Sequence, residues 1–471
     1  MIADLKPYKE YRESEGQWLG KVPAHWSVRR FKYILREKDS RSSGGKEQLL
    51  RVSQFTGVTQ RLSVNGLDEP DTRAASLVGY KCVKPDDLVV NIMLAWNGSL
   101  GVSHYDGIAS PAYCVYRFNE VAMPWYYHHL LRSPAYKARI KALSTGVVES
   151  RLRLYTDDLF RLEALLPPPD EQAAIVRFLN HTNQRIERTI RAKRKVIALL
   201  NEQKQVIIHR AVTRGLDPNV RLKSSGIPWL GEIPEHWALA SLRRYWKVAD
   251  CKHLTVPFVE EGIPLASVVE VQSFHLNLNR CKKTKPDWYR LLIEGGRKPG
   301  RGDLIYCRNV SVGACAIVNT DIDFAMGQDV CIIRSQQQNQ RYLNYMFHSP
   351  FMKTQHELLL VGSTFKRINV SQIKALTVIV PTRDEQDQIC THLDSELNHY
   401  DAIIKRTERE IDLLREYRTR LIADVVTGKL DVRQAAAGLP DEVDGTDFVD
   451  MEDLDDSCFC EGGADDENAT D

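Results

Sequence analysis

The chain has 471 residues, of which 43% are hydrophobic and 27% charged, a composition typical of a globular protein with two or three domains. No apolar run reaches the roughly 18 residues of a transmembrane helix, and Met1–Glu10 lack the apolar core of a secretory signal, so we expect a cytoplasmic protein with no membrane partner. The net charge of +2 hides an asymmetry, because residues 439–471 hold 14 Asp and Glu and no Lys or Arg.

Without that segment, 64 basic residues face 48 acidic ones. Such an excess favours a polyanionic partner, since Lys and Arg displace counterions from phosphates, although ordinary surface charge is the alternative. We expect residues 434–471 to form an acidic, disordered tail. None of the ten cysteines lies in a CxxC pair, so the sequence predicts small buried thiols and no metal site.

A nine-residue motif near the start of the chain occurs again in its second half. Trp18–Trp26 reads WLGKVPAHW and Trp229–Trp237 reads WLGEIPEHW, with an offset of 211 residues. The two tryptophans of each copy could stack on bases, but we expect them to pack each domain onto a helix end, because they recur where the neighbouring sequence diverges.

Fainter matches follow in the same order. Asp87–Val90 and Asp303–Tyr306 are apolar runs that predict strands, and Ser133-Pro134 parallels Ser349-Pro350. The chain is therefore a tandem repeat of a divergent domain.

Each copy ends in a long helical pattern. Asp170-Glu171-Gln172 recurs 214 residues later as Asp384-Glu385-Gln386, and Asp170 is the predicted N-cap of the first helix. Gly215 and Gly428 are the predicted ends. An apolar stripe at helical spacing runs along both patterns: Ile175, Leu179, Ile186, Ile190, Ile197, Leu200 and Ile207 in the first, and Ile389, Leu393, Tyr400, Ile404, Ile411, Leu414 and Leu421 in the second.

A helix of some 44 residues would be about 65 Å long and needs a second apolar surface. The nearest such surface is the other stripe. The predicted fold is α+β, with two globular domains in a tandem pseudo-twofold repeat joined by two long helices in an antiparallel coiled coil. The predicted boundaries are a first domain at 1–165, a helix at 166–216, a second domain at 217–379, a helix at 380–433 and the tail at 434–471.

The search for catalytic chemistry finds no motif. No methyltransferase-type Asn/Asp-Pro-Pro-aromatic motif and no Walker loop is present. Asp170 with Glu202-Gln203-Lys204 formally matches a nuclease pattern, but the two carboxylates would lie about 48 Å apart on one helix and cannot share a metal ion. We therefore predict a non-catalytic chain that binds no cofactor or metal itself.

The repeated Trp-Leu-Gly-x-Ile/Val-Pro-x-His-Trp motif, the Pro-x-x-Asp-Glu-Gln helix start and the divergent domains between them resemble the specificity subunit of type I restriction–modification systems. The resemblance covers about residues 14–433. It implies that each domain, a target-recognition domain, reads one half of a bipartite DNA target, while the paired helices set the spacer between the halves. It also implies partners: double-stranded DNA, two modification subunits that carry S-adenosylmethionine, and restriction subunits that use ATP and Mg²⁺.

Candidate DNA contacts are polar side chains in the loops of each domain. They are Arg41, Ser42, Lys46, Gln54, Asn97, Ser99, Thr145, Ser150, Arg151 and Arg153 in the first copy, and Arg308, Asn309, Ser311, Ser363, Thr364, Lys366 and Arg367 in the second. Arg153 and Arg367 correspond at the 214-residue offset, which favours contacts to phosphate over contacts to bases. Two other functions stay open from the residues alone: a protein-binding scaffold and a self-contained DNA-modifying enzyme.

Overall fold

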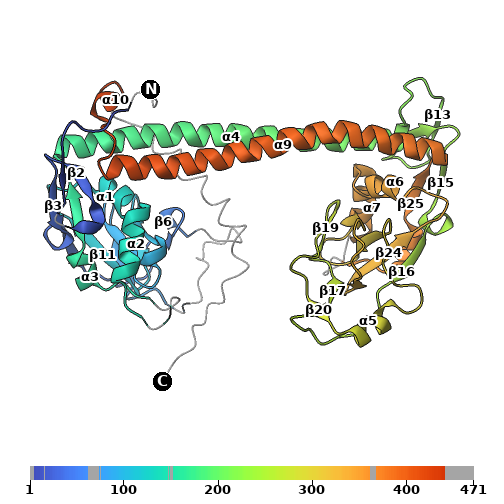
Figure 1. Cartoon of the computed structure of the whole chain (residues 1–471), viewed down its shortest axis with the longest axis horizontal. Helices are drawn as coiled ribbons and strands as arrows, with labels where there is room; N and C mark the ends of the chain where they lie inside the picture. The colour runs from blue at the N-terminus through green and yellow to red at the C-terminus, as the bar shows by residue number, and fades with distance from the viewer. Residues whose placement is uncertain are drawn as a thin grey trace. The chain divides into compact units, whose positions relative to one another are not determined.

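The computed structural model describes residues 5–14, 16–61, 74, 76–146, 148, 152–360 and 367–440. The chain divides into two compact units, which we call unit 1 (Met1–Ala192 with Arg409–Asp471) and unit 2 (Lys193–Glu408). Each unit contains one globular domain and part of each of two long helices (Figure 1). Within the described residues, no helix has the length and apolar character needed to cross a membrane.

The domain of unit 1 combines short strands with three helices. Its elements are β1 (Tyr11–Glu13), η1 (Gln17–Leu19), β2 (Lys21–Pro23), β3 (Ser27–Arg30), η2 (Phe31–Tyr33), β4 (Leu35–Lys38), β5 (Leu50–Ser53), β6 (Gly57–Gln60), β7 (Lys81–Val83), β8 (Leu88–Asn91), η3 (Ala95–Asn97), β9 (Leu100–Val102), β10 (Gly107–Ala109), β11 (Tyr113–Phe118), α1 (Pro124–Leu131), α2 (Pro134–Leu143), α3 (Thr156–Arg161) and β12 (Glu163–Leu166).

An antiparallel sheet with strand order β4-β11-β8-β9 lies at the centre of this domain. Every residue of β8 is buried, because both faces of the sheet are covered. Leu88 and Val90 join the core formed with α1, α2 and α3, whereas Val89 joins the core formed with β5, β6, β7 and β10. This arrangement explains why the three residues Leu88–Val90 of the predicted strand are all apolar rather than alternating.

The domain of unit 2 repeats this plan. Its elements are β13 (Leu222–Ser224), β14 (Glu232–Pro234), β15 (Ala238–Ser241), η5 (Leu242–Arg244), β16 (Lys247–Asp250), β17 (Ile263–Ala266), β18 (Val271–Gln272), β19 (His275–Leu276), β20 (Lys283–Thr284), α5 (Pro286–Ile293), β21 (Leu304–Cys307), β22 (Cys315–Ile317), β23 (Ala325–Met326), β24 (Val330–Arg334), α6 (Gln340–Phe347), α7 (Pro350–Leu360), α8 (Val370–Ala375) and β25 (Thr377–Val380).

The central sheet of unit 2 has the order β16-β24-β21-β22, which matches β4-β11-β8-β9 strand for strand. Its strand β21 is also buried throughout, with Leu304 and Tyr306 facing one core and Ile305 and Cys307 facing the other. The predicted α+β tandem repeat is therefore confirmed. Burial raises the pKa of the Cys307 thiol to about 12, as expected for a cysteine that packs as a small hydrophobic residue.

The two long helices are α4 (Pro169–Arg214, 46 residues) and α9 (Arg383–Val426, 44 residues). The predicted N-cap at Asp170 is wrong: α4 begins at Pro169, so Asp170 lies inside its first turn. In α9 the capping residue is Thr382, whose hydroxyl accepts a hydrogen bond from the Glu385 N–H while the Glu385 carboxylate accepts one from the Thr382 N–H. Pro168 precedes α4 at the corresponding position and has no side chain that could make this cap.

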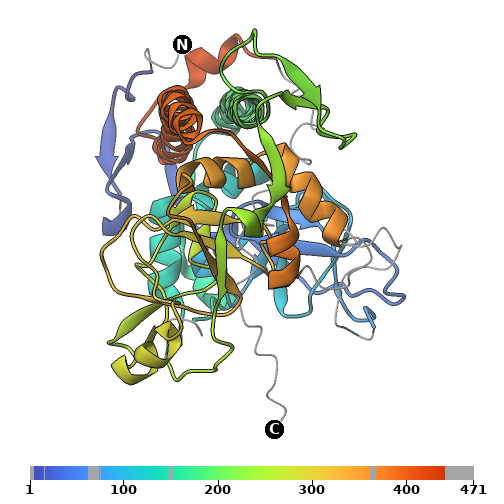
Figure 2. The ribbon, with the colours of Figure 1, turned by 90° about the vertical axis from the view of Figure 1, so that its right-hand side faces the viewer.

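Within each unit, α4 and α9 lie side by side (Figures 1 and 2). In unit 1, Ile175 and Leu179 of α4 share a core with Leu421 and Val425 of α9. The predicted stripe forms the covered face of both helices. Eight of its members are buried, namely Ile175, Leu179, Ile186, Ile190, Ile389, Leu393, Ile411 and Leu421, and the other six are half-buried, namely Ile197, Leu200, Ile207, Tyr400, Ile404 and Leu414.

Within each unit an ion pair joins the two helices. In unit 1 Arg418 Nη1 lies 2.9 Å from Glu187 Oε2, and in unit 2 Lys204 pairs with Asp401. Both members of the second pair lie at the 214-residue offset from the first, so these contacts are two copies of one interaction. From Glu187 to Lys204 the chain advances seventeen residues along α4, while their partners Arg418 and Asp401 lie seventeen residues apart in the opposite direction along α9. The two helices are therefore antiparallel and both pairs have the same register. The interaction also explains Lys204, which the sequence placed in the rejected nuclease pattern.

The chain after α9 differs from the prediction near its start. Residues 434–437 were expected in the disordered tail, but they belong to a short helix, α10 (Arg433–Ala437). Val432 and Ala436 are buried in the core of unit 1, and Arg433 lies over the ring of Tyr8. The apolar side chains of this turn therefore hold the segment to the domain. The rest of the predicted tail, from residue 441, is outside the described residues.

Gly215 and Gly428 end the long helices, as predicted, with φ of 77° and 76°. At Gly428 a Cβ would lie 2.5 Å from Pro23 Cδ and 3.0 Å from the Trp26 ring. The chain thus needs glycine there both for its left-handed backbone and for the close approach of the domain.

Replacing Gly428 with Ala should destabilise the protein by about 2 kcal/mol more than Gly79→Ala, because the new methyl group must displace Pro23 and Trp26. Gly79 is a matched control, since its φ is 86° and no atom lies within 4 Å of an added Cβ. Urea unfolding followed by tryptophan fluorescence measures both variants. Equal midpoints would show that contact with Pro23 and Trp26 does not constrain this helix end.

Candidate functional site

The repeated Trp motif clamps the domain of unit 1 onto α4. The Trp26 indole N–H donates to Glu171 Oε1 at 3.0 Å, and His25 Nε2 lies 2.8 Å from Glu171 Oε2. Tyr8 also donates to this carboxylate, which is only 2% exposed. The Trp26 ring is 1% exposed and also packs on Gly428 at the end of α9. Trp26 therefore joins the start of one long helix to the end of the other.

Unit 2 has the same clamp. Trp237 and His236 bind Glu385 Oε1 at 3.1 and 2.7 Å, and the Trp237 ring lies beside Gly215. The packing role predicted for these tryptophans is confirmed for Trp26 and Trp237. The outer tryptophan of the motif packs less deeply, since Trp229 is 41% exposed.

The glutamines of the Asp-Glu-Gln helix starts hold the domains from a second side. Gln172 Oε1 accepts the Met123 N–H at 2.7 Å, just before α1, while its amide donates to Pro167 O at 2.9 Å. Gln386 accepts the Asn339 N–H at 2.9 Å, just before α6, and donates to Pro381 O at 3.0 Å. The sequence identified this motif as a helix start only, because its partners lie about 48 residues earlier in the chain.

A shared backbone frame holds the loop that follows the central strand of each sheet. In unit 1 the Leu154 N–H donates to Ile92 O at 2.9 Å, and in unit 2 the Ile368 N–H donates to Arg308 O at 2.9 Å. Leu154 and Ile368 are each preceded by an arginine, Arg153 or Arg367, which therefore lies beside the loop. Both arginine side chains are exposed. The predicted correspondence of these arginines therefore holds at the level of the backbone.

The side chains in this frame differ between the units. The loop of unit 1 presents Met93 and Leu94, each 39% exposed. The loop of unit 2 presents Asn309, Val310 and Ser311, with Val310 73% exposed. One scaffold thus carries an apolar loop in unit 1 and a mainly polar loop in unit 2.

Asp329 organises the polar loop of unit 2. Its carboxylate accepts from Asn309 Nδ2 at 3.0 Å and from Arg367 Nη2 at 3.0 Å, and lies 3.5 Å from Arg308 Nη2. Arg308 was predicted as a DNA contact, but it is only 3% exposed and its guanidinium also lies 3.1 Å from Asp250. Its ion pairs with two carboxylates make it a residue that positions the loop, whereas Arg367, half exposed, remains able to reach a ligand.

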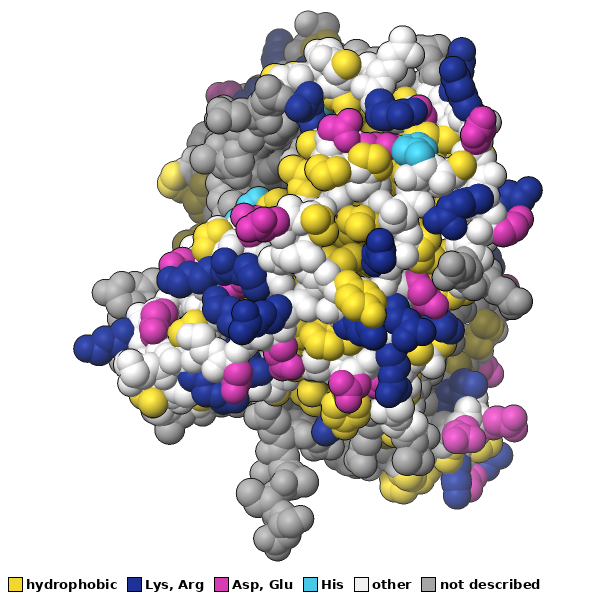
Figure 3. Space-filling model, turned by 90° about the vertical axis from the view of Figure 1, so that its left-hand side faces the viewer, with side chains coloured by type: hydrophobic (Ala, Val, Ile, Leu, Met, Phe, Trp, Pro, Cys, Tyr) yellow, Lys and Arg dark blue, Asp and Glu magenta, His cyan; other side chains and the backbone are white. Residues whose placement is uncertain are grey.

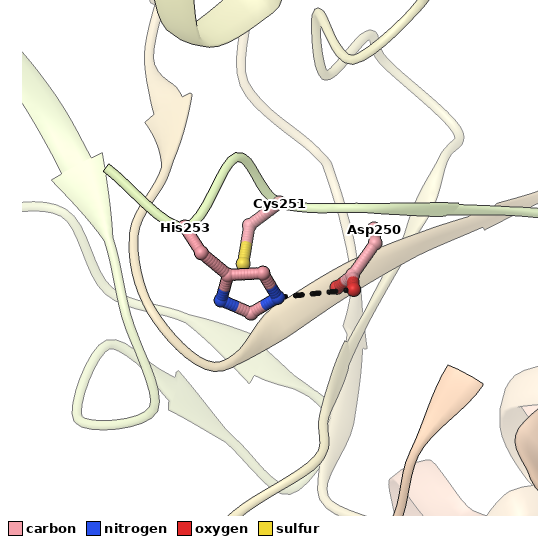
Figure 4. Close-up of side chains that lie close together, drawn as sticks. All are labelled: Asp250, Cys251 and His253. Carbon is pink, nitrogen blue, oxygen red and sulfur yellow. Dashed lines mark hydrogen bonds and ion pairs between the residues drawn. The ribbon is translucent and has the colours of Figure 1, made fainter.

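Asp250, Cys251 and His253 lie together beside this loop, with their potential metal-binding atoms within 4.8 Å of one another (Figure 4). Arg308 Nη2 also lies 3.3 Å from His253 Nε2. Burial raises the pKa of the Cys251 thiol to about 11, which disfavours the thiolate that a metal ion needs. The guanidinium therefore provides the positive charge of this cluster, which we interpret as a structural ion-pair network.

At three other predicted contact residues, the side-chain polar groups already form hydrogen bonds within local turns. Ser42 is 4% exposed, and its hydroxyl donates to Glu47 and accepts from the Gly45 N–H. Ser99 is 3% exposed and donates to the Asn97 carboxamide oxygen, which also accepts the Ser99 N–H. Ser42, Ser99 and Asn97 stabilise turns, so we withdraw them as direct DNA contacts.

The remaining predicted contacts fall into two groups. Exposed at the surface are Arg41, which is paired with Asp39, and Lys46, Gln54 and Thr145. Outside the described residues lie Ser150, Arg151, Ser363, Thr364 and Lys366.

A basic cleft of about 450 Å³ in unit 1 was missed by the sequence predictions. It is lined by residues from α2, from α4 and α9 and from the loop around Gln54, and its charged members are Arg132, Lys137, Glu187, Arg188, Arg191 and Arg418. Lysine and arginine side chains also gather in groups on the face of the molecule drawn in Figure 3. The residues that line the cleft come from five separate segments, around Gln54, Val102, Arg132, Gln184 and Thr419, so their proximity was not visible in the sequence.

Comparison with known proteins finds a similarity to one kind of protein. Residues 254–413 match the family model described as "Type I restriction modification DNA specificity domain". The type I restriction enzyme MjaVIII specificity subunit of Methanocaldococcus jannaschii is 22% identical over 452 residues, which cover 92% of this chain and 99% of that protein. The chain is similar to type I restriction specificity subunits over most of its length. The resemblance predicted from the repeated motifs is confirmed.

Two further comparisons find a similar protein and a similar fold. The EcoBI specificity subunit of Escherichia coli is 22% identical, and the match covers 77% of each chain. A chain from a solved structure of the type I R-M system has the same fold, with a TM-score of 0.63 and 15% identity, over 87% of this chain and 99% of that chain.

The clamp in unit 2 makes stability depend on pH. Burial by itself raises the pKa of Glu385, but hydrogen bonds from His236, Thr382 and Trp237 outweigh it and lower the pKa from 4.5 to about 2. The carboxylate therefore stabilises the fold fully above about pH 5, and this contribution is lost as the pH falls toward 2.

Glu385→Gln should lower the free energy of unfolding at pH 7 by about 1–2 kcal/mol, a value reduced for the partial exposure of the carboxylate. The difference from the parent chain should shrink as the pH falls from 5 to 3. Denaturant titrations across this pH range measure it, with Glu235→Gln, at an exposed position of the same motif, as the control. A difference that does not change with pH would contradict the role of the charged carboxylate.

Proposed function

We propose that this chain is the DNA-sequence-specific recognition subunit of a type I restriction–modification complex, and that the domain of each unit reads one half of a bipartite target. The main support for the proposal is that equivalent backbone hydrogen bonds in the two units hold loops with different side chains. The hydrogen bonds Leu154–Ile92 and Ile368–Arg308 are equivalent, yet they hold loops that present different side chains. Two equivalent readers with different side chains suit two different half-sites.

Exposed cations near each frame would contact phosphate. Arg153 and Arg367 occupy equivalent exposed positions, and the excess of basic residues outside the segment 439–471 supports a polyanionic partner. Such contacts set the position of a protein on DNA without selecting bases. Base selection is then left to side chains of the divergent loops.

The paired helices are proposed to fix the spacer between the half-sites. A continuous helix of 46 residues is about 69 Å long, and the Glu187–Arg418 and Asp401–Lys204 pairs define a single register. A defined register converts the second contact into an effectively intramolecular event, so two modest interactions give one selective one.

The proposed protein partners are inferred from the repetition of the domain and helices in the two units. Two equivalent helix-and-domain surfaces suit two modification subunits, to which we assign S-adenosylmethionine and the methyl transfer. Restriction subunits would carry ATP and Mg²⁺. This chain is then assigned recognition and no reaction of its own.

Exchanging residues 20–160 for the corresponding domain of another specificity subunit should change only one half of the recognised sequence. Binding selections on random DNA, performed on the chain assembled with modification subunits, measure this. The logarithm of the affinity should also fall linearly with the logarithm of salt concentration. A scaffold that binds only proteins would show neither behaviour, and turnover of DNA by the purified chain would favour a self-contained enzyme.

Inserting seven residues into each helix, after Ala192 and after Glu408, should lengthen the spacer by about three base pairs. Seven residues preserve the heptad phase and add about 10.5 Å of helix, while base pairs lie about 3.4 Å apart. The same selection reads out the spacer. An insertion in α4 alone is the control, since it breaks the register and should abolish bipartite recognition. An unchanged spacer in the double insertion would exclude the helices as the ruler.

A further inference from the structure

The basic cleft of unit 1 has an excess of positive charge. Five cationic side chains and one carboxylate line it, and that carboxylate, Glu187, is already paired with Arg418. Lys137 has no ion pair with a described carboxylate. Burial, and secondly the charge of Arg132, lower the pKa of Lys137.

Polar atoms of the cleft also lack partners. The hydroxyl of Ser133, a residue 2% exposed, and the half-buried Thr56 hydroxyl make no hydrogen bond within the described structure. Ser133 is the N-cap residue of the ten-residue helix α2 and makes no side-chain cap, so the first N–H groups of α2 also lie at this wall. Buried hydroxyls and a helix N-terminus are groups that an anion would satisfy.

The chain carries an anionic segment of its own. Residues 441–471 contain 14 Asp and Glu and no Lys or Arg. They follow α10, which is held near the start of α4 by Arg433 over the ring of Tyr8, itself bonded to Glu171. The α4 residues of the cleft, Asn180 to Arg191, lie about 14–30 Å along the helix from Glu171. Thirty-one residues can span about 100 Å, so the segment is long enough to reach the cleft.

We propose that residues 441–471 dock in the basic cleft of unit 1, with Asp and Glu carboxylates on Lys137, Arg188 and Arg191, and that the segment competes there with DNA phosphate. The docking is independent of the proposed function, and only the competition rests on it. A segment of the same chain is present at high effective concentration, which favours it over free anions.

Docking is tested with the chain ended after Pro440 and a labelled peptide of residues 441–471 added in trans. Lys137→Gln with Arg191→Gln should weaken peptide binding about tenfold, as expected for the loss of two partly screened charge contacts. The matched control is Lys46→Gln with Arg185→Gln, which removes one lysine and one arginine from exposed positions of unit 1 outside the cleft. Equal weakening in both variants would reduce the interaction to general charge attraction and overturn the proposal.

Carbodiimide coupling of the full chain provides a second test that needs no substitution. This reagent joins a carboxylate directly to a lysine amine in contact with it, so segment carboxylates should couple to Lys137 in preference to Lys46. Peptide mapping by mass spectrometry locates the bonds. Coupling spread evenly over exposed lysines would contradict docking in the cleft.

The competition is measured as DNA affinity with and without residues 441–471. At low salt, the shortened chain should bind DNA about tenfold more tightly than the full chain. Replacing the 14 acidic residues with Asn and Gln should have the same effect at unchanged length. Unchanged affinity in both would exclude competition. If neither chain bound DNA, the proposed function would fail, whereas peptide binding and coupling at Lys137 would still decide the docking.

Discussion

The whole structure depends on one buried contact made twice: a tryptophan that joins a domain to both long helices. The Trp26 indole binds Glu171 at the start of α4, and its ring covers Gly428 at the end of α9. Trp237 makes the same contacts with Glu385 and Gly215. Because each domain holds two helix ends at once, it cannot turn on one helix without losing its grip on the other. The orientation of each domain relative to its adjoining helix ends is therefore fixed by side chains far from the loops.

The interhelix ion pairs answer a different requirement, the choice of register. Glu187–Arg418 and Asp401–Lys204 lie beside the apolar stripe, with side chains between 20% and 57% exposed. Such pairs add little stability, because their desolvation offsets most of their attraction. A slip of one helical turn, however, would leave charged groups opposite apolar ones. Apolar packing thus provides the association, and the two charged contacts select one alignment from several that the stripe alone would allow.

The sequence predicted the features that recur, and it missed those formed by contacts distant in sequence. The repeat, both helices and their covered stripe were visible because each leaves a pattern in consecutive residues. The partners of Glu171, Trp26 and Tyr8, lie 145 and 163 residues earlier, and the cleft around Lys137 draws on five segments. Arg308 was predicted to be an exposed contact because arginine side chains are usually exposed. Its side chain is instead buried and forms ion pairs with Asp250 and Asp329. Ser42 and Ser99 were chosen by residue type, and only the structure shows that turns use their hydroxyls.

In each unit the backbone contacts that hold the loop are separate from the side chains that the loop presents. The backbone contacts Leu154–Ile92 and Ile368–Arg308 need no particular side chain, so the residues beside them can change without disturbing the sheet. Met93 and Leu94 in one unit and Asn309 and Ser311 in the other occupy that position. Side chains in the cores, and those that join each domain to the long helices, are less free to change, because each of them contacts several other residues. The loop tips can therefore diverge in sequence while the contacts between each domain and its helix ends stay the same.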